Sequence, residues 1–272
     1  MLSRLQLSVY CLHTSLALLA LSGCSDDDNP VDASSADASL IMIGEAVSEG
    51  TRVQVYSEGR LHVGYNRLFV ALRDSASDEQ RHEAYVEIQL SMQMQMENDT
   101  MMHGAPVENP SSAESEDGMF AAGVVFIMPG TWQLGVEFRA TGSDRAGTAL
   151  IEAEVEGSNL VKAVTGNDGK EYFVTLVAPR APVAGLNDFE ITVHRMESMA
   201  SFPGVEDLTV GMEPSMPSMG HGSPSNVNPT HTGSGHYVGR VNFTMTGDWR
   251  IDVSLSKDGS VLLDTRFDMT LE

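Results

Sequence analysis

Cysteine is almost missing from this sequence of 272 residues. Its two copies, Cys11 and Cys24, both stand close to the N-terminus. The rest of the chain contains no thiol, which excludes a structural disulfide there and any metal site built on thiolates.

Basic residues are also few, because 16 Lys and Arg face 38 Asp and Glu and leave a net charge of −22. A surface of this sign repels nucleic acid and anionic lipid, so we expect no nucleic-acid partner. An acidic surface is common among soluble proteins, and we draw no more specific function from it.

The familiar catalytic motifs are absent. The sequence has no Gly-x-Ser-x-Gly elbow, no His-Glu-x-x-His motif and no phosphate-binding glycine loop. Its carboxylates are scattered, and we interpret the single histidines His62, His82 and His194 as surface or hydrogen-bonded residues. We therefore predict that the protein is not an enzyme and has no catalytic residues.

The N-terminus has the pattern of an exported protein. A basic residue, Arg4, precedes an apolar run that is too short to span a bilayer and is typical of a secretory signal peptide. The run ends in Leu21-Ser22-Gly23-Cys24, which resembles the bacterial lipobox, where the cysteine thiol accepts diacylglycerol. We predict a lipoprotein signal peptide over 1–23 and membrane attachment through Cys24.

The residues after the lipobox predict a tether and a destination. Residues 24–39 are polar and acidic with almost nothing apolar, so they favour a flexible tether. Ser25 follows the cysteine, and in Gram-negative lipoproteins a serine at this position favours the outer membrane. We expect a lipid-anchored protein of the cell envelope, at the outer membrane, on either its periplasmic or its surface face.

An internal repeat divides the remainder of the chain. The segment from Phe126 to Trp132 matches the segment from Phe243 to Trp249, at an offset of 117 residues (249 − 132). Upstream, the segment around Asn66 resembles that around Asn187 at an offset of 121 (187 − 66). The repeat predicts two similar domains, 40–155 and 156–272.

Apolar residues alternate with polar or small ones in both copies, which is the period of strands with one buried face, and no helical period persists. The pattern predicts a hairpin through Pro129-Gly130, an equivalent hairpin through Gly247, and core positions for Trp132 and Trp249. Further strands are predicted over 51–56, 68–72, 84–92, 172–177, 189–194 and 261–270. We predict an all-β protein of two tandem immunoglobulin-like antiparallel β-sandwich domains.

Methionine and histidine gather in one segment of each copy. The first copy has Met101-Met102-His103-Gly104, and the second has Met216-Pro217-Ser218-Met219-Gly220-His221-Gly222. Aligning His103 with His221 also aligns Met101 with Met219, so the same chemistry occurs twice. The second segment, followed by Gly-x-Tyr, Phe-x-Met-x-Gly and Trp, resembles the YtkA-like family, which is close to FixH-like domains. The resemblance implies an exported immunoglobulin-like domain associated with metal transport or oxidase assembly, without a settled biochemical activity.

Thioethers and imidazole together suit Cu(I), whereas Zn²⁺ prefers thiolate, carboxylate or several histidines. We therefore predict a copper site of modest affinity outside the cytoplasm. The predicted ligands are Met216, Met219 and His221 in the second copy and Met101, Met102 and His103 in the first, with Met212, His231 and His236 as further candidates.

Structural packing is the competing interpretation of these methionines. Met92, Met94 and Met96 continue an apolar strand face, as does Met212, and we interpret them as core or strand-edge residues. Met216 and Met219 lie among Pro, Ser and Gly, where we expect a loop at the end of the sandwich. Three functions stay open: a copper-handling lipoprotein, a module that docks an envelope protein partner without metal, and a spacer without a ligand.

Overall fold

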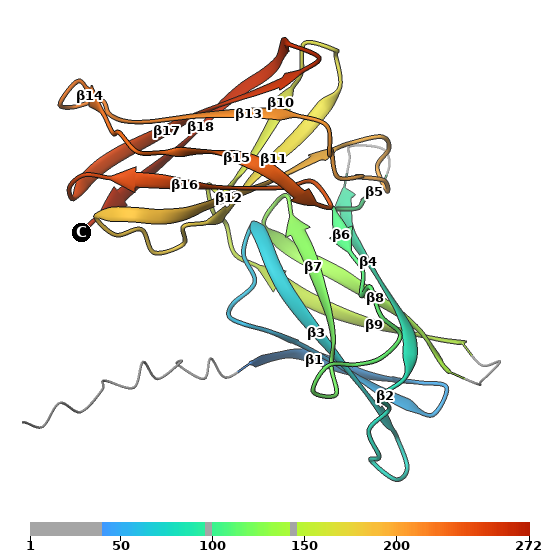
Figure 1. Ribbon diagram of the computed structural model, residues 1–272. Coiled ribbons are helices and arrows are strands. Elements are labelled where there is room, and N and C mark those ends of the chain that lie inside the picture. Colours follow the sequence, from blue (N-terminus) through green and yellow to red (C-terminus); the bar gives the residue numbers. More distant parts are fainter. Residues whose placement is uncertain (1–39, 96–99, 142–145) are drawn as a thin grey trace, which may run out of the picture. The chain divides into compact units, whose positions relative to one another are not determined.

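The computed structural model describes residues 40–95, 100–141 and 146–272 (Figure 1). The predicted signal peptide 1–23, the lipidation site Cys24 and the tether 24–39 lie outside the described residues. Within the described ranges, no helix is long and apolar enough to cross a membrane.

The first domain packs two antiparallel sheets face to face. One sheet has the strand order β1-β2-β3-β7-β6 and the other has the order β5-β4-β8-β9. The strands are β1 (Ile41–Ser48), β2 (Thr51–Ser57), β3 (Gly64–Asp74), β4 (Ala84–Gln95), β5 (Thr100–His103), β6 (Val107–Glu108), β7 (Phe120–Phe126), β8 (Gly130–Ala140) and β9 (Ala146–Val155).

The second domain repeats this arrangement with every strand number raised by nine. Its sheets have the orders β10-β11-β12-β16-β15 and β14-β13-β17-β18. The strands are β10 (Val161–Thr165), β11 (Glu171–Ala178), β12 (Gly185–Arg195), β13 (Thr209–Met216), β14 (His221–Gly222), β15 (Val227–Gly233), β16 (His236–Phe243), β17 (Gly247–Lys257) and β18 (Ser260–Leu271). The predicted fold, two tandem immunoglobulin-like sandwiches, is confirmed.

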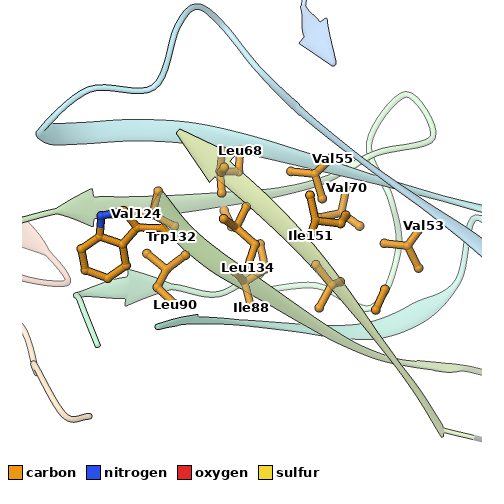
Figure 2. Close-up of a cluster of buried hydrophobic side chains, with 14 of the residues drawn as sticks. Val53, Val55, Leu68, Val70, Ile88, Leu90, Val124, Trp132, Leu134 and Ile151 are labelled. Atoms are coloured by element: carbon orange, nitrogen blue, oxygen red, sulfur yellow. The ribbon is translucent and has the colours of Figure 1, made fainter. Parts of the chain in front are cut away.

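Alternating apolar residues fill the space between the sheets. Figure 2 shows this core in the first domain, where side chains from β2, β3 and β7 meet side chains from β4, β8 and β9. Trp132 is fully buried there, and Trp249 is equally buried in the second domain, as predicted. Each indole N–H donates to a carbonyl four residues earlier, that of Met128 at 3.0 Å and that of Met245 at 2.9 Å. Burying an aromatic ring of this size contributes roughly 2–3 kcal/mol, and the hydrogen bond satisfies its polar N–H.

The two predicted hairpins are wrong. Strand β7 pairs with β3 and β6, whereas β8 pairs with β4 and β9, so Pro129-Gly130 carries the chain from one sheet to the other. Strands β16 and β17 are separated in the same way. The alternating pattern is identical for a strand of either sheet, because both sheets bury one face in the same core.

Candidate metal site

The second domain brings one predicted methionine and its histidine directly opposite each other. Met216 ends β13, His221 begins β14, and the two residues are cross-strand partners. The amides of Met219 and Gly220 donate to the Met216 carbonyl at 3.0 and 2.9 Å, which closes the turn between the strands. Opposite residues of an antiparallel pair project to the same side with Cβ atoms about 4.5–5.5 Å apart. A thioether and an imidazole therefore share one face at this end of the sheet.

Met216 does not lie in a loop, and that prediction is wrong. It continues the buried side of β13 after Val210 and Met212, and only 3% of its surface is exposed. Its neighbouring prolines suggested a loop, but β13 is paired on its β14 side only at Ser215 and Met216, so it behaves largely as an edge strand that tolerates Pro214. A Cβ atom added at Gly247 would stand 2.8 Å from the Met216 methyl carbon, which shows how closely the backbone of β17 approaches it.

His221 presents one nitrogen that is suited to bind a metal. Its ring is half-buried and lies edge-on to Trp249, with ring centroids 6.3 Å apart. Its Nδ1 atom lies 3.1 Å from the Gly222 carbonyl oxygen. A carbonyl only accepts, so Nδ1 carries the proton and Nε2 keeps its lone pair in the neutral ring. Metal-binding histidines are commonly held in one tautomer by such a bond.

The first domain contains the same pair, formed by a methionine that the sequence assigned to the core. Met92 of β4 is the cross-strand partner of His103, and it is buried like Met216. Its methyl carbon lies 3.4 Å from a Cβ atom added at Gly130, the counterpart of Gly247. His103 Nδ1 donates to the Gly104 carbonyl at 2.7 Å, which leaves Nε2 with the lone pair here too. Met92 becomes a ligand candidate only through the pairing of β4 with β5, which places it opposite His103. The sequence does not give this pairing.

The predicted set of three ligands in the first domain is divided between two faces of its strand pair. Met101 is opposite Met94, on the same side as His103 and Met92. Met102 is opposite Gln93 on the other side, and half of its surface is exposed. Met102 is therefore not placed with His103 by the strand register. His103 itself packs against Phe202, with ring centroids 5.8 Å apart.

The remaining candidates have different surroundings. Met219 lies in the turn between β13 and β14 and is 61% exposed, so its thioether is open to solvent beside the pair. Met212 and Met216 both border a surface hollow of about 600 Å³ that also includes His221. His231 packs against Tyr237, and His236 contacts two carboxylates. Within the described ranges, no three His, Cys, Asp or Glu side chains are arranged to hold a metal, so thioethers would have to complete any site at these pairs.

Comparison with known sequences agrees with this duplicated geometry. The sequence profile described as YtkA-like matches residues 45–137 and again residues 167–254. The chain belongs to the YtkA-like family. The two matched regions of this YtkA-like protein correspond to the two sandwiches, and each includes one Met–His pair.

Other comparisons are distant. No curated protein matches the sequence. Among solved structures, domains 5–6 of the S-layer protein SbsC align with 10% identity and a TM-score of 0.31, over 86% of this chain and 99% of that one. The Escherichia coli adhesin FdeC aligns with 15% identity and a TM-score of 0.27, over 84% of this chain and 66% of that one. The D0-D1 domain of intimin aligns with 12% identity and a TM-score of 0.23, over 78% and 93% of the two chains.

Proposed function

We propose that this YtkA-like protein is a non-enzymatic envelope lipoprotein that binds Cu(I) with one Met–His pair in each domain, in copper handling or assembly. The observation that supports the proposal is the recurrence of the pair. Met92 and His103, like Met216 and His221, are cross-strand partners, and both histidines donate from Nδ1 to the next carbonyl.

The ligand chemistry favours Cu(I) over harder ions. Thioether sulfur is soft and uncharged, and a neutral imidazole adds a nitrogen donor without adding charge. The thioether carries no proton to lose, and a neutral imidazole that donates from Nδ1 offers the lone pair of Nε2 to the metal. Further thioethers neighbour each pair along the chain or in the strand register. Met219 lies in the turn between Met216 and His221, and Met101 and Met94 are the next residues on the same side as His103 and Met92.

The proposal is tested by titrating Cu(I) into residues 25–272 under reducing conditions against a competing chelator. We expect two equivalents to bind. The double variant Met216→Leu/His221→Ala should bind one equivalent, and Met92→Leu/His103→Ala should also bind one. Leucine replaces each buried methionine because the exchange nearly conserves volume and leaves no large cavity.

A matched control removes the same two residue types elsewhere. Met42 is 47% exposed, and His82 is exposed and contacts the Ser115 hydroxyl at 3.3 Å. The variant Met42→Leu/His82→Ala should therefore keep both equivalents. Equal Cu(I) binding by all variants, or no binding by the wild type, would overturn the copper proposal and favour a module that acts without metal.

A further inference from the structure

Five polar side chains from the two domains meet at one place, and we call them the interdomain cluster. The first domain contributes Tyr65 of β3 and Glu108 of β6. The second contributes Glu190 and His194 of β12 and His236 of β16. None of the five takes part in the Met–His pairs, so variants of the cluster leave all the proposed copper ligands in place.

His236 stands between two carboxylates, one from each domain. Its Nδ1 lies 2.5 Å from Glu190 Oε1, and its Nε2 lies 2.8 Å from Glu108 Oε1. An ionised carboxylate can only accept, so both ring nitrogens donate and the ring is an imidazolium. The side chain of His236 is 15% exposed, and those of Glu108 and Glu190 are 24% and 28% exposed. Charge-assisted bonds of this kind are stronger than neutral ones when solvent is largely excluded.

The surrounding groups hold Glu108 in place. The Tyr65 hydroxyl donates to Glu108 Oε2 at 3.1 Å, and the Tyr65 ring lies perpendicular to the His236 ring with centroids 5.2 Å apart. A Cβ atom at Gly123 would stand 2.3 Å from the Tyr65 hydroxyl and 2.6 Å from Glu108, so only glycine leaves room for this contact. Glu108 is thus bound by Tyr65 of its own domain and by His236 of the other domain.

His194 is the fourth titratable group beside Glu108, and it is buried. Its Nε2 lies 4.0 Å from Glu108 Oε1, and its Nδ1 has no hydrogen-bond partner. Burial lowers the pKa of His194 to about 4, so this ring is neutral at neutral pH. The charge that pairs with Glu108 therefore belongs to His236.

We propose that the interdomain cluster is a latch that holds the two domains together through protonated His236 and releases them when that proton is lost. A neutral imidazole can donate from only one nitrogen, so deprotonation leaves either Glu108 or Glu190 facing a lone pair. A partly buried carboxylate that loses its donor is destabilised, and separation of the domains restores its contact with water.

The pH at which the latch opens depends on the pKa values of its groups. Burial alone would lower the pKa of His236, but the hydrogen bonds and charges of Glu108 and Glu190 raise it to about 9. A group whose pKa is raised from an ordinary 6.5 stabilises the closed state fully below 6.5 and loses that effect as pH rises through about 9. Burial opposes ionisation of Glu108, yet contacts with His236 and Tyr65 hold its pKa below its usual value of 4.5. The closed state therefore weakens again in acid, as Glu108 becomes protonated.

Spin labels placed in both domains test the latch. Residues 25–272 contain no cysteine, so Thr148→Cys and Asp264→Cys, both exposed, give one label in each domain. We expect a narrow distribution of label distances at pH 6.5 and a broad one at pH 10, with the closed state weakened by up to roughly two orders of magnitude. Glu108→Gln should give the broad distribution at both pH values. Glu87→Gln, at an exposed position of β4, is the matched control and should behave as the wild type.

Two further results decide whether His236 is responsible. In His236→Gln the distribution should no longer change between pH 6.5 and pH 10. The His236 ring, followed by NMR, should titrate well above 6.5 in the wild type and closer to 6.5 in Glu108→Gln. A distribution that stays narrow in Glu108→Gln, or an alkaline broadening that persists in His236→Gln, would overturn the latch while leaving the copper proposal untouched.

Discussion

At the scale of single residues, the glycine before each core tryptophan links the fold to the candidate metal site. Gly247 has φ +122°, a conformation that other residues rarely adopt, and a Cβ atom there would stand 2.8 Å from the buried methyl of Met216. We predict that Gly247→Ala destabilises the protein by about 1–3 kcal/mol and lowers the Cu(I) affinity of the second domain. Urea unfolding and Cu(I) competition measure the two effects.

Gly185 provides the comparison for this prediction. Its φ is similar, +110°, but nothing lies within 4 Å of a Cβ atom added there. Gly185→Ala should therefore show the backbone cost while leaving Cu(I) affinity unchanged. Equal Cu(I) affinities in the two variants would mean that the position of Met216 does not matter for binding.

Some residues of the candidate metal site are predictable from the sequence, and others are not. His103 and His221 could be singled out because the Met/His segment occurs twice, and Met216 because it stands in the second of these segments. Met92 could not, since an alternating strand pattern explains it fully as a core residue, and it is one. The Met92 thioether is both a core side chain and a possible metal ligand, and only the strand pairing shows that it lies opposite His103.

At the scale of elements, one asparagine in each domain closes the bend before a central strand. Asn66 accepts from the amide of His62 at 3.2 Å and donates to the carbonyls of His62 and Gly64 at 2.8 and 2.9 Å. Asn187 makes the same three bonds to Val183 and Gly185 at 3.0, 2.8 and 2.9 Å. The segments around Asn66 and Asn187 therefore resemble each other in sequence because each asparagine closes the same bend.

We predict that Asn66→Ala lowers the free energy of unfolding by about 2–3 kcal/mol, because it leaves one buried and two partly buried backbone groups without partners. Asn187 lies in a more exposed bend, so Asn187→Ala should cost less, about 1–2 kcal/mol. Asn159 is exposed and makes no side-chain hydrogen bond in the described structure, so Asn159→Ala is the control in urea unfolding. An effect of Asn66→Ala no larger than that of Asn159→Ala would contradict the role of the bend.

Strands were predictable where the alternating pattern is long, but their partners were not. Each strand predicted outside the two hairpins lies within an observed one, and the strand pattern of β7 and β8 was recognised as well. Their assignment to one hairpin failed because a short connection that crosses between sheets has the same Pro-Gly composition as a hairpin turn. Local residues specify the strand, whereas the packing of the whole core specifies its sheet.

At the scale of the whole molecule, the duplication was visible in the sequence and the contact between its copies was not. Glu108 and His236 are 128 positions apart and belong to no common motif. The interpretation of His194 as a surface or hydrogen-bonded histidine is wrong, because its side chain is buried and its Nδ1 has no hydrogen-bond partner. His194 lies on a strand of the second domain, and its sequence does not show that Glu108 of the first domain comes to lie 4.0 Å from it.

Membrane attachment is the last prediction at this scale, and it rests on Cys24 alone. A protein with a net charge of −22 is repelled by anionic lipid, so its charge gives it no electrostatic attachment to such a membrane. Each buried CH₂ group of an acyl chain contributes about 0.8 kcal/mol, and stable anchoring takes more than one chain. We therefore expect Cys24→Ser to move the protein from the membrane fraction to the soluble fraction, and mass spectrometry of the wild type to find acyl chains on residue 24.

The second cysteine supplies the control for this experiment. Cys11 lies inside the predicted signal peptide, so Cys11→Ser should be processed and anchored as the wild type is. Salt should not restore membrane binding to Cys24→Ser, because screening removes repulsion without supplying an apolar anchor. Cys24→Ser protein that has lost residues 1–23 and still stays in the membrane fraction after a high-salt wash would exclude the lipid as the anchor, and attachment would then have to come from a protein partner.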